Sequence, residues 1–171
     1  MSQPVFLVGP MGAGKTTIGK QLAQQLGYPF KDSDREIEDR TGADIPWIFD
    51  VEGEAGFRQR EVVVLADLAT QGQLVIATGG GIVMREENRD CLKQSGIVFY
   101  LTASTEQLLE RTAKDKRRPL LQVADPESRI RELLAIRDPL YAEVATYIIN
   151  TEKRPPRQVA QEMADLVRNH K

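Results

Sequence analysis

A lysine within a glycine-rich segment is the strongest chemical signal in the sequence. The segment runs from Gly9 to Thr17 as GPMGAGKTT, directly after the apolar run VFLV. Its spacing, Gly-x-x-x-x-Gly-Lys-Thr, is that of a phosphate-binding loop. Glycines permit a tight turn in which successive backbone N–H groups point at an anion, and the helix that follows adds its positive N-terminal end. We therefore expect a nucleoside triphosphate to bind here.

The side chains of this loop have distinct expected tasks. Lys15 supplies a mobile cation for the β- and γ-phosphates, and the Thr16 hydroxyl can coordinate Mg²⁺, the expected cofactor. The other expected ATP-binding residues of the loop are Gly12, Ala13, Gly14 and Thr17. The alternative is a glycine-rich turn with an incidental lysine. The pattern also leaves open whether the phosphate is hydrolysed or transferred.

Two carboxylates in the segment KDSD are candidates for completing the magnesium site. Many phosphate-loop enzymes place an aspartate at the end of a later strand, but here LVIAT runs into Gly79 and IVFYL into Thr102. Asp32 and Asp34 follow the expected second strand, and residues two apart face the same way in extended chain. We expect both to point into one cleft. The alternative is that Asp34 only caps the next helix.

Three arginines stand where they could bind an anion. Arg58 has Glu61 one helical turn away, which could orient its guanidinium for a planar anion or form a solvated ion pair. Arg118 lies in the segment KDKRRPLL, which could be a lid over transferring phosphate or a solvated loop. Arg137 precedes Pro139, where we expect a helix to end, and a surface position is its alternative.

These residues must be positioned by strands that alternate with helices. We expect strands at residues 5–8, 28–32, 74–78, 97–101 and 147–150. We expect helices at residues 16–27, 34–42, 55–71, 85–96, 104–112, 126–138 and 155–170, the fifth opening on Ser104 and Gln107 at the spacing of a capping box. This alternation predicts an α/β fold with a parallel sheet covered on both faces, in which ligands bind at the carboxyl ends of the strands.

The composition fits one soluble domain of 171 residues. With a net charge of −2 and no apolar run long enough to cross a bilayer, we expect neither nucleic acid nor membrane as a partner. The one cysteine, Cys91, excludes an internal disulfide, and with no signal peptide in view we expect a cytoplasmic location. We expect a monomer, because each helical face has a sheet to cover, and we expect His170 to be a solvated tail residue.

Together these segments resemble the shikimate kinase family, in the nucleoside-monophosphate-kinase-like branch of phosphate-loop proteins. The resemblance covers nearly the whole chain, from FLVGPMGAGKTTIGKQLA through DSDREIEDRTG, IFDVEGEAGFRQRE, ATGGG and RPLL to RDPLY. It implies a three-layer α/β/α fold with a five-stranded parallel sheet in the order 2-3-1-4-5. It also implies one domain over residues 1–171, with a shikimate-binding region at about 33–61 and a mobile lid at about 113–125.

The resemblance also implies a reaction and residue roles. The family moves the γ-phosphoryl group of ATP to the 3-hydroxyl of shikimate, on the route to chorismate and the aromatic amino acids. Asp34 matches the candidate general base, and Arg58 and Arg137 match the pair that grips the shikimate carboxylate. The implied catalytic residues are thus Asp34, Lys15 and Arg118. The other implied contacts are Gly80, flanked by Gly79 and Gly81, to shikimate, Thr16 and Asp32 to the metal, Arg118 to the ATP phosphates, Arg111 near the adenine and Arg154 to the nucleotide.

Two other functions stay open. Another small-molecule kinase, such as a gluconate kinase, should keep the phosphate loop but not the paired DSD and FRxxE segments. A non-catalytic nucleotide-binding switch should lose its acceptor residues before its phosphate loop, and this sequence has both sets.

Overall fold

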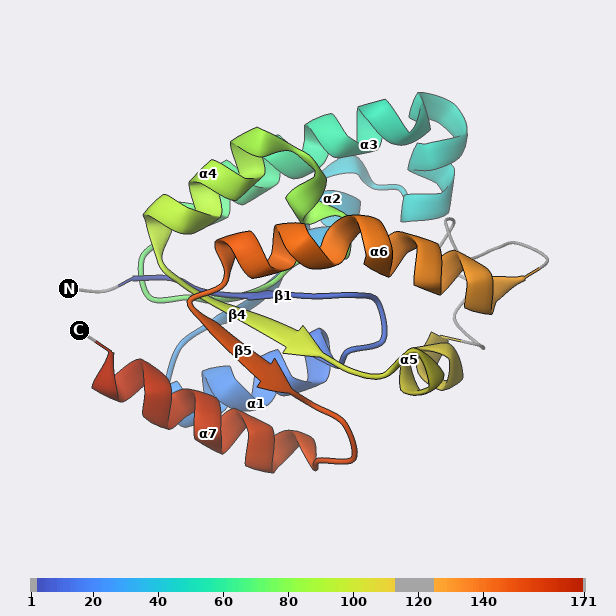
Figure 1. The fold of residues 1–171 in the computed structure, drawn as a ribbon. Helices are drawn as coiled ribbons and strands as arrows, with labels where there is room; N and C mark the ends of the chain where they lie inside the picture. Colours follow the sequence, from blue (N-terminus) through green and yellow to red (C-terminus); the bar gives the residue numbers. More distant parts are fainter. Residues whose placement is uncertain (1–2, 113–124, 171) are drawn as a thin grey trace.

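A computed structural model describes residues 3–112 and 125–170 of the chain. Its sheet has the order β2-β3-β1-β4-β5, and every neighbouring pair of strands is parallel, which confirms the predicted architecture. The strands are β1 (Val5–Val8), β2 (Phe30–Asp32), β3 (Val75–Ala77), β4 (Ile97–Thr102) and β5 (Tyr147–Asn150). Because all strands run the same way, the loops that follow β1, β4 and β5 lie at one edge of the sheet, on the right of Figure 1.

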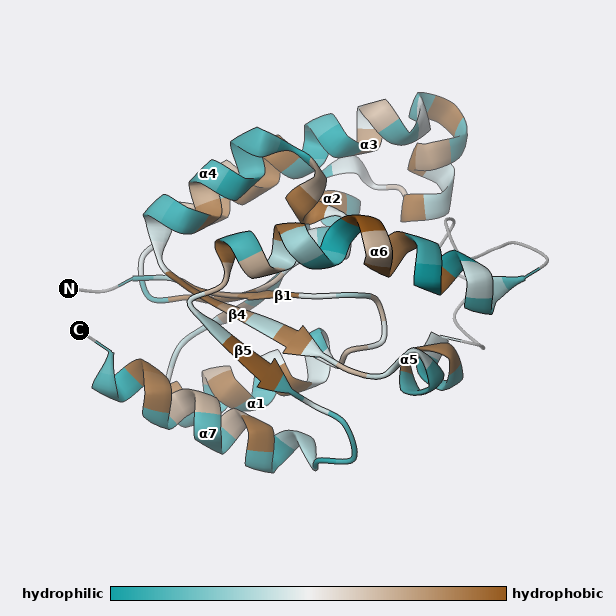
Figure 2. Cartoon of the chain, in the orientation of Figure 1, coloured by the Kyte–Doolittle hydropathy of each residue, from teal (hydrophilic) through white to brown (hydrophobic). Residues whose placement is uncertain are grey.

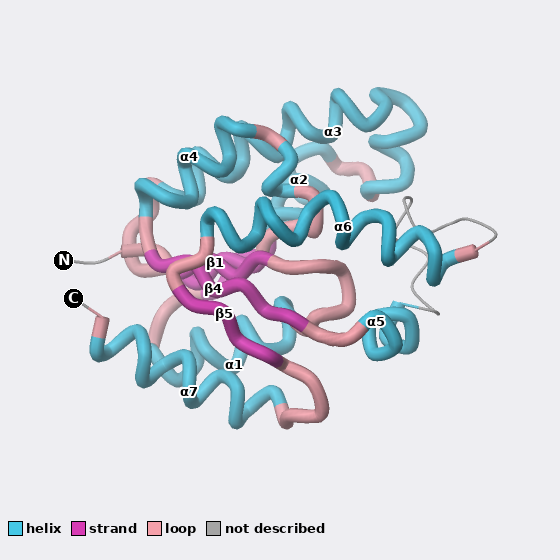
Figure 3. Tube along the Cα trace, viewed as in Figure 1, coloured by secondary structure: helices cyan, strands magenta, loops and turns pink. Residues whose placement is uncertain are grey.

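Helices flank the sheet on both faces, giving three layers (Figure 3). On one face, α1 (Lys15–Leu26) packs beside α7 (Pro156–Asn169). The other face carries α2 (Ser33–Thr41), α3 (Ile45–Ala69), α4 (Glu86–Ser95) and α6 (Pro126–Val144). The helix α5 (Thr105–Thr112) follows β4, and a single 3₁₀ turn, η1 (Ile82–Met84), follows β3. Within the two described ranges, no helix is long and apolar enough to span a membrane.

Each face of the sheet has its own apolar core. In β1, Val5 and Leu7 pack into the core beneath α1 and α7, whereas Phe6 and Val8 pack into the core beneath α3, α4 and α6. All four side chains are fully buried, which explains why β1 reads as a continuous apolar run. The helix α7 buries one face only, and Figure 2 shows apolar and polar residues alternating along it.

The helix predicted to start at Ala55 begins earlier, at Ile45. The Asp44 side chain accepts from the Trp47 N–H at 3.0 Å and caps it. The helix is interrupted at Gly53, whose φ of 74° and ψ of 176° are not helical. The sequence prediction therefore found only the part of α3 that follows this break.

The helix predicted to end before Pro139 continues to Val144, so that prediction is wrong. Proline has no N–H, so its position lacks one helical hydrogen bond. The turn that follows is nevertheless held in place, because Tyr141 is fully buried and Val144 is 3% exposed. Burial of these side chains outweighs the local effect of the proline.

Two expectations near helix ends need correction. His170 is not a solvated tail residue, because its Nδ1 lies 2.9 Å from the Tyr147 hydroxyl and the two rings meet edge to face. Half of the capping box is present, since Ser104 Oγ accepts from the Gln107 N–H at 3.1 Å. The Ser104 N–H, however, donates to the Glu152 carboxylate at 2.9 Å instead of to Gln107.

Candidate active site

The segment between β1 and α1 has the backbone of a phosphate-binding loop. Gly9, Gly12 and Gly14 have φ angles of 145°, 87° and 94°, which other residues rarely adopt. A Cβ on Gly9 would lie 2.5 Å from the Leu101 carbonyl oxygen, so the loop passes directly against the end of β4. It then leads into α1, whose first-turn N–H groups carry the positive end of the helix dipole.

Lys15, the first residue of α1, reaches back to this loop. Its Nζ donates to the carbonyl oxygens of Gly9 at 2.7 Å and Pro10 at 2.9 Å. The side chain is only 9% exposed. These contacts hold the ammonium at the loop, where it can act on bound phosphate.

Thr16 and Asp32 lie side by side at the end of β2, with Thr16 Oγ1 donating to Asp32 Oδ2 at 2.9 Å. Magnesium prefers oxygen ligands and keeps several waters, so a hydroxyl next to a carboxylate fits an ion that phosphate oxygens and water also hold. Across residues 3–112 and 125–170, no cluster of three or more His, Cys, Asp or Glu could hold a metal by itself. The residues present therefore suit an ion that arrives with a nucleotide.

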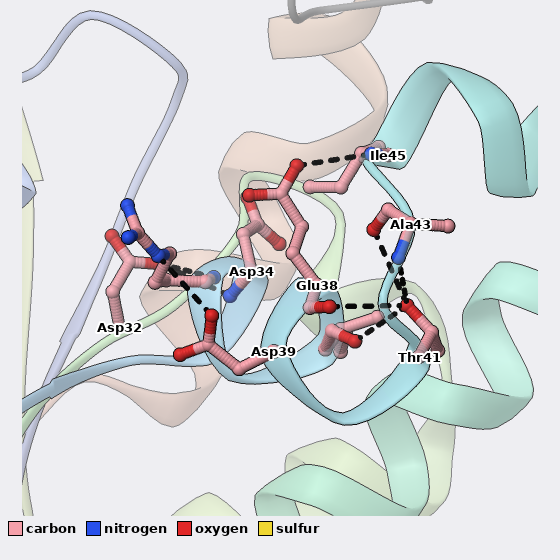
Figure 4. Close-up of polar contacts among 9 residues, drawn as sticks. Asp32, Asp34, Glu38, Asp39, Thr41, Ala43 and Ile45 are labelled. Atoms are coloured by element: carbon pink, nitrogen blue, oxygen red, sulfur yellow. Dashed lines mark hydrogen bonds and ion pairs between the residues drawn. The ribbon is translucent and has the colours of Figure 1, made fainter.

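Asp34 lies in the first turn of α2, as the predicted helix 34–42 implies, so the extended spacing used to pair it with Asp32 does not apply. The cap of α2 is Asp32, whose Oδ1 accepts from the N–H groups of Asp34 at 3.0 Å and Arg35 at 3.4 Å. The alternative that Asp34 caps α2 is therefore wrong. At the other end Thr41 Oγ1 donates to the Ile37 carbonyl at 2.9 Å, so α2 is tied at both ends (Figure 4).

The turn after β3 is where the acceptor-site candidates meet. An added Cβ on Gly79 would lie 2.5 Å from Asp34 Oδ1 and 3.0 Å from Glu61 Oε2. One on Gly81 would overlap the Arg58 guanidinium. Neither glycine has a positive φ. Glycine thus lets the charged side chains approach this turn closely, and backbone conformation does not demand it.

Gly80, in the middle of this turn, lies close to the third predicted acceptor-site residue, Arg137. A Cβ there would lie 3.4 Å from Arg137 Nη1 and 3.3 Å from the Met11 side chain of the phosphate-binding loop. The three glycines therefore lie against four charged side chains, and the turn borders the nucleotide loop. The residues that converge on it are Asp34 from α2, Arg58 and Glu61 from α3, and Arg137 from α6.

Arg58 is held by carboxylates in a buried position. Its Nη1 donates to Glu61 Oε1 at 2.7 Å, and its Nε donates to Glu54 Oε2 at 3.3 Å. Arg58 is 6% exposed and Glu61 is fully buried, so the alternative of a solvated ion pair is wrong. Burial raises the pKa of Glu61 to about 7, although Arg58 lowers it. The Glu61 carboxylate thus orients the Arg58 guanidinium toward the turn 79–81.

Arg137 is also buried, at 4% exposure, so the alternative of a surface position is wrong. In the part of the chain that the structure describes, it forms no ion pair with a carboxylate. Burial lowers the pKa of Arg137, the interaction with Tyr141 raises it, and the nearby charge of Arg58 lowers it further. Arg58 thus pairs directly with Glu61 whereas Arg137 does not, and an anion bound between the two guanidiniums would be favoured.

Two other residues predicted to contact the nucleotide, Arg111 and Arg154, have different surroundings. Arg111 on α5 donates to the Gly12 carbonyl at 2.8 Å, so it lies against the phosphate-binding loop. Arg154 instead donates to the Asn150 carbonyl at 3.0 Å and to Glu162 at 3.1 Å, after β5. Arg118, with residues 113–124 of the predicted lid, lies outside the described residues.

Sequence reasoning missed one residue of the acceptor site, Tyr141. It lies four residues after Arg137, on the same face of α6, and interacts with that guanidinium. Helical spacing is the signal that could have found it. Because Pro139 was expected to end the helix, Tyr141 was not placed on the same helical face as Arg137.

The raised pKa of Glu61 predicts a pH-dependent contribution to stability. Because its folded pKa of about 7 exceeds its ordinary value of 4.5, the folded protein retains a proton that the unfolded chain releases between these pH values. This contribution is complete below about pH 4.5 and is lost as the pH rises through 7. Urea unfolding of the wild type and Glu61→Gln should therefore show a difference in free energy that falls between about pH 5 and 8. A difference that does not change with pH would contradict the prediction.

A phosphate-binding loop beside buried arginines and a carboxylate defines an ATP-dependent small-molecule kinase. The family model described as shikimate kinase matches residues 11–168. The chain is 61% identical over 159 residues to a shikimate kinase of Pseudomonas savastanoi pv. phaseolicola, covering 93% of this chain and 92% of that relative. The chain belongs to the shikimate kinase family.

Solved structures agree with this membership. A shikimate kinase from Acinetobacter baumannii in complex with shikimate has a TM-score of 0.97 and 55% identity, covering 100% of this chain and 96% of that one. A shikimate kinase from Aquifex aeolicus has a TM-score of 0.82 and 36% identity, covering 94% and 93%. These similarities extend over the fold, including the sheet order that positions the glycine turn.

Proposed function

We propose that this protein transfers the γ-phosphoryl group of ATP to the 3-hydroxyl of shikimate, a step toward chorismate and the aromatic amino acids. The observation that carries the proposal is the convergence of Asp34, Arg58 and Arg137 on the turn 79–81, next to the phosphate-binding loop. Shikimate has one carboxylate and several hydroxyls, with no base or extended chain. Two guanidiniums and one carboxylate are a matching set of partners for it.

The acceptor is held from opposite ends in this proposal. Arg58 and Arg137 bind the shikimate carboxylate, and the planar guanidinium of each can make a two-point contact. Asp34 binds the reacting hydroxyl, and the backbone of Gly80, flanked by Gly79 and Gly81, contacts the ring. Phosphoryl transfer depends on such positioning more than on covalent chemistry.

The donor is held by the phosphate-binding loop. Lys15 and the loop N–H groups neutralise the phosphates, and Thr16 with Asp32 would hold Mg²⁺, partly through water. When bound, this ion offsets charge on the β- and γ-phosphates. Asp34 accepts the proton of the attacking hydroxyl as the phosphoryl group moves.

The remaining assignments are part of the same proposal. They are a phosphate contact for Arg118, nucleotide contacts for Gly12, Ala13, Gly14, Thr17, Arg111 and Arg154, one domain over residues 1–171, a cytoplasmic monomer, and no nucleic-acid or membrane partner. The contact of Arg111 with the phosphate-binding loop supports its nucleotide role. The contacts of Arg154 with Asn150 and Glu162 leave its role resting on the family resemblance.

A coupled assay of ADP release tests the function directly. Shikimate, quinate and gluconate are supplied in parallel with ATP and Mg²⁺, together with a reaction that lacks an acceptor. We expect rapid ADP release with shikimate alone. Turnover with gluconate would indicate a different kinase, and ADP release without any acceptor would indicate a nucleotide-dependent switch.

The carboxylate clamp predicts a selective loss of acceptor binding. A charge-assisted hydrogen bond contributes about 1.5–3 kcal/mol, so Arg58→Ala should weaken shikimate binding roughly ten- to a hundredfold. Arg137→Lys should also weaken it, because lysine cannot reproduce a planar two-point contact. Titration calorimetry with each ligand should show nearly unchanged ATP affinity without shikimate. Unchanged shikimate affinity in both variants would remove the clamp from the proposal.

A further inference from the structure

The Tyr141 side chain joins two parts of the acceptor site that are far apart in sequence. Its hydroxyl donates to the Gly80 carbonyl oxygen at 2.5 Å. The Arg137 side chain lies one helical turn away and lines the same cavity, close enough for the two groups to interact electrostatically. Because a tyrosine hydroxyl has one proton and two lone pairs, it can donate to the carbonyl while accepting from a guanidinium. Tyr141 thus bridges α6 and the turn after β3.

The position of this bridge is fixed by packing. Tyr141 is fully buried, and its ring lies 4.9 Å from the ring of Tyr100 on β4. The neighbouring Tyr100 hydroxyl donates to Asp138 and takes no part in this bridge. Burial raises the pKa of Tyr141 to about 12, with Arg137 opposing the rise, so the hydroxyl keeps its proton near neutral pH.

The bridge also sets the direction of a backbone donor. The Gly80 carbonyl and the Gly81 N–H belong to one peptide unit, and in a trans peptide they point in opposite directions. No cis peptide bond is present in the ranges that the structure describes. Holding the Gly80 carbonyl toward α6 therefore turns the Gly81 N–H away from α6. The Ile82 N–H donates to the Gly79 carbonyl at 3.1 Å and closes this turn, and the Tyr141 hydroxyl adds a contact to its central peptide.

We propose that Tyr141 is a positioning residue for the acceptor, which holds the Arg137 guanidinium and the Gly80–Gly81 peptide in fixed relation. This inference rests on the proposed function and deepens it. Tyr141 acts through Arg137 and the peptide and does not touch the reacting atoms. Its loss should therefore weaken shikimate binding more than it slows transfer within the bound complex.

Tyr141→Phe tests this role, because it removes the hydroxyl and keeps the ring that fills the core. The KM for shikimate should rise about five- to thirtyfold, while kcat stays within about threefold and the KM for ATP is unchanged. Wild-type turnover of shikimate is measured first, so a failure of the proposed function would be seen separately. A thermal melt confirms that the variant is folded.

Tyr100→Phe is the matched control, since it removes a neighbouring hydroxyl that contacts neither Arg137 nor Gly80. It should alter the melting temperature but leave the KM for shikimate unchanged. In Arg137→Ala, adding Tyr141→Phe should reduce kcat/KM by less than it does in the wild type, because the two residues act together. An unchanged shikimate KM in folded Tyr141→Phe, an equal rise in Tyr100→Phe, or full additivity in the double variant would overturn the proposal.

Discussion

Lys15→Ala is expected to abolish shikimate-dependent ADP formation while leaving the protein folded. Preorganised positive groups that meet developing charge typically contribute about a hundred- to a thousandfold to turnover, and Lys15 is the ammonium held at the phosphate-binding loop. Its ammonium donates to the carbonyl oxygens of Gly9 and Pro10, and its removal leaves the side chains of both apolar cores in place, so the fold should survive. The coupled ADP assay and circular dichroism measure these two outcomes.

Lys93→Ala is a suitable control for this loss of charge. Lys93 lies on α4 and pairs with Glu143 at 3.0 Å, and both side chains are more than 40% exposed. Removing an exposed pair of this kind costs little stability and should not alter turnover. Near-normal turnover by a folded Lys15→Ala protein would exclude the role assigned to this lysine.

Asp34→Asn is expected to lose most phosphoryl transfer and to retain ATP binding. An amide cannot accept the hydroxyl proton, and general bases typically contribute about a hundred- to ten-thousandfold. The substitution keeps the size of a side chain that packs against Gly79. Stopped-time ADP measurements at saturating shikimate would show the loss in kcat, and calorimetry would show the retained ATP affinity.

Asp32→Asn should behave differently, because Asp32 is placed beside Thr16 and not at the glycine turn. Asparagine is as good a helix cap as aspartate, so α2 should be preserved. We expect this variant to need more Mg²⁺ for half-maximal activity. If both variants showed the same magnesium-dependent defect and bound shikimate normally, the division of roles between the two acids would be wrong.

The sequence was informative where one local pattern decides the structure. The buried strands read as apolar runs, and the loop Gly9–Thr17 carries glycines at positions with positive φ, so both could be predicted. The pairing of Arg58 with Glu61 follows from helical spacing and was also predicted. Helical spacing does not indicate whether a pair is buried, and burial is what distinguishes this pair from a solvated ion pair.

The errors came from positions where distant contacts outweigh local preference. Pro139 normally ends a helix, but buried Tyr141 and Val144 carry α6 past it. The pairing of Asp32 with Asp34 was argued from extended spacing, but the Asp32 side chain caps α2 and Asp34 lies in its first turn. In each case the deciding contact was either a tertiary one or a side-chain cap that two equally suitable aspartates could have formed.

The burial of Arg58 and Arg137 side by side has a consequence for heat resistance. Burying a charge in a poorly hydrated region disfavours the folded state, and at Arg137 burial and the nearby charge of Arg58 both lower the pKa of the guanidinium. The carboxylate of bound shikimate would supply a counter-ion for these two guanidiniums, so we expect shikimate to raise the melting temperature of the protein. Apolar residues at these positions would favour a more thermostable protein that no longer recognises its substrate, so selection for durability and selection for catalysis oppose each other here.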